Sequence, residues 1–196
     1  MHDLFLRPVH HRPSPPGGAL SAWRRAHRGG CVALLTLLSC AAMADVYSEV
    51  NDKINSSQWA AAQTLIERQL EKQPADPQIR LMQSQMQMAQ GQTTQAIETL
   101  LALTQEFPEL PEPYNNLAVL YAGQQRFDEA LSALTLAVRA RPDYSVALEN
   151  LGDVHIALAR QSYLKAQSLP LPGPAMSARL SGKIQLSGQL LQPAKP

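Results

Sequence analysis

The chain has 196 residues with 17 basic and 16 acidic side chains, enough for one domain with a proper hydrophobic core. The charge divides unevenly, because residues 1–44 hold five arginines and one aspartate, a net charge of +4, whereas the body after them holds 12 basic and 15 acidic groups, a net charge of −3. Nucleic-acid binding requires a basic face, which an acidic body does not provide. Both cysteines lie before residue 45, so disulfide frameworks and cysteine zinc sites are excluded for the body.

Residues 1–44 are typical of an N-terminal extension followed by a secretory signal peptide. Residues 23–28 are positively charged, residues 31–40 form an apolar run too short to span a bilayer, and Ala42-Met43-Ala44 has the small-residue pattern of a cleavage site. We therefore predict an exported, periplasmic protein whose mature chain starts at Asp45. The alternative for the apolar run is a core helix that follows arginines by chance.

The end of the apolar run offers a second processing route. Leu37-Leu38-Ser39-Cys40 resembles a bacterial lipobox, in which the cysteine is lipidated and becomes the new N-terminus. Leu38 is an unusual residue for the middle of that motif. The resemblance implies Cys40 as a candidate lipidation residue, and a membrane anchor as the alternative to cleavage after Ala44.

The body repeats itself every 34 residues. Three columns of residues share this step: Pro74, Pro108 and Pro142; Ala62, Ala96 and Ala130; Ile66, Leu100 and Leu134. One period in three independent columns is not expected by chance, and 34 residues is the period of the tetratricopeptide repeat (TPR). Residues 45–168 therefore resemble a row of TPRs.

The best copy of the repeat is residues 111–144. Its first helix carries an apolar stripe, because Tyr114, Leu117 and Tyr121 recur at i, i+3 and i+7. Small residues stand where the two helices of the copy must approach each other closely. Pro142 lacks an amide hydrogen and therefore ends the second helix.

The other copies are less regular. In the second one, Asp76-Pro77 supplies an N-cap side chain and a proline at the first helical position. The last copy loses the repeat pattern after Gly152 and is predicted to be a shortened or continuous helix from about Ser145 to Ser168. The predicted organisation is an N-terminal extension and signal peptide (1–44), a TPR domain (45–168) with repeats at about 45–76, 77–110, 111–144 and 145–168, and a C-terminal segment (169–196) with a proline-punctuated linker, a capping helix over 175–191 and a frayed tail.

The resemblance implies an all-α fold: a right-handed superhelical solenoid of three to four TPR helix hairpins with a C-terminal capping helix. Stacked helix pairs form a concave groove that is lined by the first helix of each repeat, and family members bind peptides or protein segments there. Carried over to this chain, the predicted partner-binding residues are Leu81, Gln85, Glu112, Asn115, Asn116, Val119, Glu149, Asn150 and Asp153.

These groove positions indicate the chemistry of a partner. Asparagine side chains both donate and accept hydrogen bonds, which suits a peptide backbone, and the three acidic residues favour a basic partner. The basic residues with which some family members hold a peptide's terminal carboxylate are missing here, which argues against a C-terminal tail as ligand. The alternative interpretation of these positions is solvated helix surface.

No catalytic, metal-binding or cofactor motif is recognisable in the body. His155 is its single histidine, and Asp153, two residues earlier, does not face it on a helix, so His155 is interpreted as a partly buried packing residue. We therefore predict a non-enzymatic scaffold without a cofactor that binds a protein or peptide in the periplasm, binds no nucleic acid, and touches a membrane only if Cys40 is lipidated. The alternatives are a lipid-anchored outer-membrane assembly factor with the same body and, more distantly, an accessory domain of a cell-envelope hydrolase.

Overall fold

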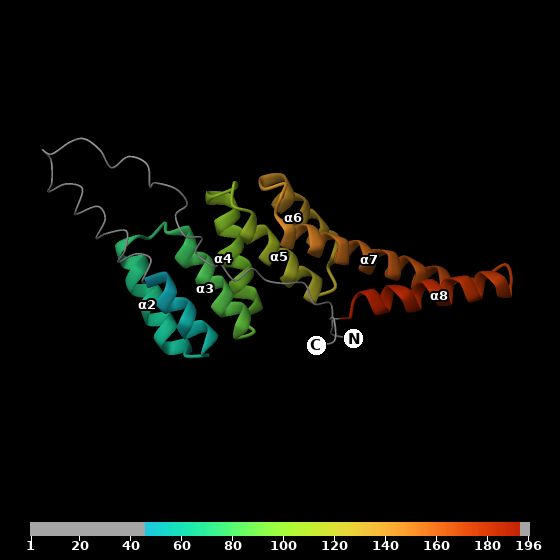
Figure 1. Cartoon of the computed structure of the whole chain (residues 1–196), viewed down its shortest axis with the longest axis horizontal. Coiled ribbons are helices and arrows are strands. Elements are labelled where there is room, and N and C mark those ends of the chain that lie inside the picture. Colours follow the sequence, from blue (N-terminus) through green and yellow to red (C-terminus); the bar gives the residue numbers. More distant parts are fainter. Residues whose placement is uncertain (1–45, 193–196) are drawn as a thin grey trace, which may run out of the picture. The chain divides into compact units, whose positions relative to one another are not determined.

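The computed structural model describes residues 46–192, and the regular structure in this range is entirely helical. The expectation of an all-α fold is therefore confirmed for the described residues. The first helix spans residues 46–55, and the others are α2 (Trp59–Lys72), α3 (Pro77–Ala89), α4 (Thr93–Glu106), α5 (Pro111–Gly123), α6 (Phe127–Ala140), α7 (Ser145–Gln167) and α8 (Pro174–Leu190) (Figure 1).

The described residues form two compact units, residues 46–91 and residues 92–192. None of the helices in either unit is long and apolar enough to cross a membrane. The predictions of cleavage after Ala44 and of lipidation at Cys40 lie outside the described residues.

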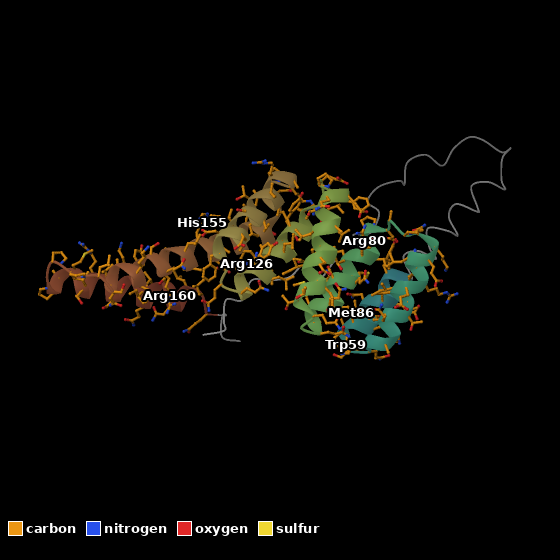
Figure 2. All side chains as sticks on the ribbon, turned by 180° about the vertical axis from the view of Figure 1, so that it is seen from behind. Trp59, Arg80, Met86, Arg126, His155 and Arg160 are labelled. Atoms are coloured by element: carbon orange, nitrogen blue, oxygen red, sulfur yellow. The ribbon has the colours of Figure 1, made fainter. Side chains whose placement is uncertain are left out.

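The unit of residues 46–91 packs its three helices around one apolar core. Trp59 and Tyr47, both half-buried, pack against the edge of this core. The core itself consists of Val50, Ile54, Ala62, Ile66, Ile79, Met82 and Met86 (Met86 is marked in Figure 2).

The start of α3 is fixed by the predicted N-cap. Asp76 Oδ1 accepts hydrogen bonds from the backbone amides of Gln78 (3.0 Å) and Ile79 (3.1 Å), and Pro77 occupies the first turn. The second carboxylate oxygen of Asp76 accepts a 2.9 Å hydrogen bond from Tyr47 Oη. Burial, followed by this hydrogen bond, raises the pKa of Tyr47 to about 12. The same carboxylate therefore caps α3 and joins it to the first helix.

The columns of the 34-residue repeat are core positions in both units. Every residue of the alanine column and of the large apolar column is fully buried. Because the core is closely packed, each repeat keeps a small side chain at the first of these positions and a large one at the second. In the unit of residues 92–192, the columns bury Ala96, Leu100, Ala130 and Leu134.

The turns inside the helix pairs also follow the 34-residue step. Ser57, Gly91 and Gln125 all have positive φ angles, of 56°, 71° and 61°. This left-handed conformation is strained for any residue with a Cβ atom, so glycine is the favoured residue at the position. The repeat uses glycine at one of these three turns.

The last two helices form a hairpin in which α8 lies along the second half of α7 (Figure 1). α7 is continuous, as predicted for this part of the chain, and α8 forms where the capping helix was expected. Gln167 Nε2 donates a 3.1 Å hydrogen bond to Ser181 Oγ, and Lys183 Nζ lies 4.8 Å from the centre of the Tyr163 ring. The two helices are thus joined by polar and cation–π contacts as well as by Leu180, which is buried.

Candidate functional site

Seven of the nine predicted partner-binding residues come from two helices that contact each other, α5 and α7. The spacing explains this: on each helix the predicted residues recur at three- or four-residue steps and therefore share a face. The residues are Glu112, Asn115, Asn116 and Val119 on α5, and Glu149, Asn150 and Asp153 on α7.

The three asparagines join α5 to α7. Asn150 Nδ2 donates a 2.8 Å hydrogen bond to Asn115 Oδ1, and Asn115 Nδ2 lies 3.5 Å from Asn116 Oδ1. All three side chains are fully buried, so the alternative interpretation of solvated helix surface is wrong for them. Because a buried amide requires hydrogen-bond partners, this contact stabilises the packing of the two helices.

Glu112 meets a basic residue that the sequence analysis missed. Arg141 Nη1 lies 2.9 Å from Glu112 Oε1, and Glu112 is 8% exposed. The Arg141 guanidinium also lies 5.4 Å from the centre of the Tyr144 ring. Burial, followed by the negative charge of Glu112, raises the pKa of Tyr144. The charge of Glu112 is therefore balanced within the molecule.

The remaining residues on these two helices are more accessible. Glu149 is exposed, whereas Val119 and Asp153 are half-buried. Glu149 and Asp153 are thus more accessible than Glu112, which is buried beside Arg141.

The other two predicted residues, Leu81 and Gln85, lie on α3 in the unit of residues 46–91. They are one turn apart and share a face of the helix. Both are 6% exposed, so they are more deeply buried than the interpretation as solvated surface implies.

The expectation for His155 is wrong, because its side chain is exposed on α7 (Figure 2). At the equivalent position of the best repeat, Tyr121 is covered by Arg126, whose guanidinium lies 4.5 Å from the ring centre. Arg126 reaches Tyr121 because the chain turns back between α5 and α6. α7 continues without a turn, so Arg160, one 34-residue step after Arg126, does not return over His155.

The described residues contain no group of three or more histidine, cysteine, aspartate or glutamate side chains that could hold a metal ion. On α5 and α7 the asparagine amides are buried, and the more accessible groups are two carboxylates and one half-buried apolar side chain.

Comparisons with solved structures support the fold. The chain resembles TTC0263, a thermophilic TPR protein of Thermus thermophilus, with 23% identity, a TM-score of 0.53 and coverage of 74% of this chain and 86% of that one. It also resembles a chain in the structure of Naa15/Naa10 bound to HypK-THB, with 19% identity, a TM-score of 0.52 and coverage of 75% of this chain. This chain spans only 24% of the length of that one. No curated protein sequence matches.

Two family profiles, both described as tetratricopeptide repeat, match residues 47–111 and residues 87–151. Together they cover more than half of the chain and include α2 to α6 and most of the α5–α7 face. The 34-residue columns, the helix pairs and these matches agree. The chain belongs to the tetratricopeptide repeat family, whose members are protein–protein interaction scaffolds.

Proposed function

We propose that this protein is a non-enzymatic periplasmic scaffold that binds a protein or peptide segment along the face formed by α5 and α7. The observation that carries the proposal is that Val119, Glu149 and Asp153 stay accessible on these two adjoining helices, whereas the asparagines between them are buried. The Asn150–Asn115 hydrogen bond holds the helices in a fixed relation. A rigid face loses little conformational entropy on binding, which favours affinity.

The charge of the face favours a basic partner. Glu149 is exposed and Asp153 half-buried, and opposite charge across an interface speeds association and discriminates against acidic partners. The side chain of Val119 on α5 is half-buried and offers an apolar contact. A segment with lysine or arginine beside an apolar residue fits this chemistry.

Charge reversal tests the proposal. Replacing Glu149→Lys and Asp153→Lys together should weaken capture of the native partner by on the order of tenfold, because attraction becomes repulsion. The matched control is the double variant Glu98→Lys and Asp143→Lys, which reverses two exposed carboxylates elsewhere in the same unit. Capture is measured by crosslinking and co-purification from the native cell envelope. Equal capture by the two double variants would contradict the proposed face, and robust hydrolytic activity of the purified protein would contradict a non-enzymatic role.

The periplasmic location rests on the signal-peptide pattern before Asp45. Mass spectrometry of the mature N-terminus separates the alternatives. A chain that starts at Asp45 supports the unanchored periplasmic form, and an acylated Cys40 supports a membrane-anchored assembly factor. An intact residue 1 would contradict both.

A further inference from the structure

The charge of the body changes sign along the chain at Asp153. Residues 45–153 hold 7 basic and 15 acidic groups, whereas residues 154–196 hold five basic groups and no acidic one. Four of these five cations lie in the second half of α7 and in α8: Arg160, Lys165, Arg179 and Lys183. None of the four forms an ion pair with a described residue.

The same part of the chain exposes leucines. Residues 154–192, here called the C-terminal hairpin, contain four large apolar side chains that are 37–58% exposed: Leu164, Leu169, Leu186 and Leu190. An exposed leucine alone is ordinary. Four exposed leucines in a hairpin that has basic but no acidic residues indicate a binding surface for a partner that is both anionic and apolar.

Two cations and two leucines of α8 form one stripe. Arg179, Lys183, Leu186 and Leu190 follow one another at i, i+4, i+7 and i+11, which places them along one side of the helix. All four are exposed, whereas Leu180 and Ser187, on the side toward α7, are buried. The stripe therefore combines two cations and two leucines that are all exposed, although Lys183 also contacts the Tyr163 ring of α7.

We infer that the C-terminal hairpin docks on an anionic phospholipid surface. Lysine and arginine are attracted to lipid phosphates and keep their charged ends among the headgroups, while leucines at the same height enter the apolar boundary below. A nucleic acid would attract the cations but leave the leucines in water, so lipid fits the stripe better. Since α8 is too short and too polar to cross a bilayer, the hairpin would lie on the surface. This inference does not depend on the proposed α5–α7 face.

A fluorophore placed on the hairpin tests the contact directly. In the predicted mature chain, which starts at Asp45 and contains no cysteine, the label is attached at Gln189→Cys on α8 or, as a matched control, at Gln105→Cys on α4; both glutamines are exposed. The vesicles contain phosphatidylcholine, phosphatidylglycerol and a nitroxide-labelled lipid. We expect quenching at residue 189 but not at residue 105, and no quenching when phosphatidylglycerol is left out. Equal quenching at the two residues, or none at residue 189, would overturn the inference.

Two surface variants identify the groups responsible. Arg179→Gln with Lys183→Gln, and Leu186→Ser with Leu190→Ser, should each lower vesicle affinity by on the order of tenfold, measured through the label at residue 189. The control, Arg68→Gln with Lys72→Gln on α2, removes two exposed cations from the acidic part of the chain and should change nothing. Circular dichroism checks that all variants stay folded. Retained affinity in either hairpin variant would overturn the inference. So would salt-dependent self-association without any quenching, which would identify a second copy of the chain as the occupant.

Discussion

The helix pairs α5–α6 and α7–α8 are neighbours in one compact unit but place their leucines differently. In α5–α6, Leu117 and Leu134 are buried among alanines whose small side chains let the helices approach closely. In α8, Leu186 and Leu190 are each 57% exposed. The first pair follows the 34-residue pattern and the second has lost it. Leucine at a core position of the repeat is therefore buried, whereas these two leucines of α8 remain available for contact with another surface.

The largest expected difference between the two helix pairs is in the stability lost when a leucine is replaced by alanine. Leu134→Ala should lower the free energy of unfolding by about 2–5 kcal/mol, because it removes buried apolar contacts and leaves a cavity. Leu186→Ala should change it by less than about 0.5 kcal/mol, since its side chain already faces water. Urea denaturation measures both. If Leu186→Ala lowers the free energy of unfolding about as much as Leu134→Ala, the side chain of Leu186 is buried, which contradicts the structure.

A smaller effect is expected where α7 still belongs to the repeat. Asn150→Ala removes the donor of the 2.8 Å hydrogen bond to Asn115 in a fully buried contact, which should cost about 1–3 kcal/mol in unfolding free energy. The control is Gln161→Ala, on the exposed surface of the same helix, with little expected change. If the two substitutions cost the same, the amide contact does not hold α5 and α7 together.

Tyr144 directly precedes α7, and its replacement should change the stability of the protein differently at neutral and at alkaline pH. Its hydroxyl is buried and has no hydrogen-bond partner among residues 46–192, so Tyr144→Phe should raise the unfolding free energy by about 1 kcal/mol at pH 7. Burial raises the pKa of Tyr144 in the folded state, so its contribution to stability is present below pH 10 and declines as the pH rises above that value. The advantage of the phenylalanine variant should therefore grow above pH 10. A constant difference between the two proteins in urea titrations across this range would contradict the raised pKa.

The smallest predicted effect is a gain at the α5–α6 turn. Gln125 has a φ angle of 61°, at the position where the preceding repeat has Gly91. Gln125→Gly should relieve left-handed strain of about 1–2 kcal/mol but increase the entropy of the unfolded chain, for a net gain below about 1 kcal/mol. Gly91→Ala is the converse control and should destabilise. Thermal unfolding measures both variants. If the two substitutions shift the melting temperature in the same direction, the two turns are not equivalent.

The periodicity of the sequence predicts the fold because residues 34 positions apart occupy equivalent places in successive repeats. Ala62, Ala96 and Ala130 are therefore all buried, and the N-cap at Asp76 could be predicted because it acts within one turn of its own helix. Contacts between repeats are harder to predict. The Glu112–Arg141 ion pair joins residues 29 positions apart, and the amide contact of Asn150 joins residues 35 apart.

The candidate site shows the same limit. The repeat pattern indicates which residues share a face on α5 and on α7, but polar residues on a helix face are ordinarily solvated, and only the packed structure shows that the asparagines are buried. Likewise, aligning His155 with Tyr121 predicts a packed residue, although the covering contact depends on a turn that α7 does not make.

The measurement that tests the proposed function most directly is site-specific photo-crosslinking. A photoreactive phenylalanine analogue replaces Val119 on the α5–α7 face or, as the control, Leu136, which is 40% exposed on α6. The proteins are expressed in their native envelope and irradiated there. Binding on the α5–α7 face predicts a discrete crosslinked protein at residue 119 and none at residue 136. A crosslink at residue 136 with none at residue 119 would contradict the account.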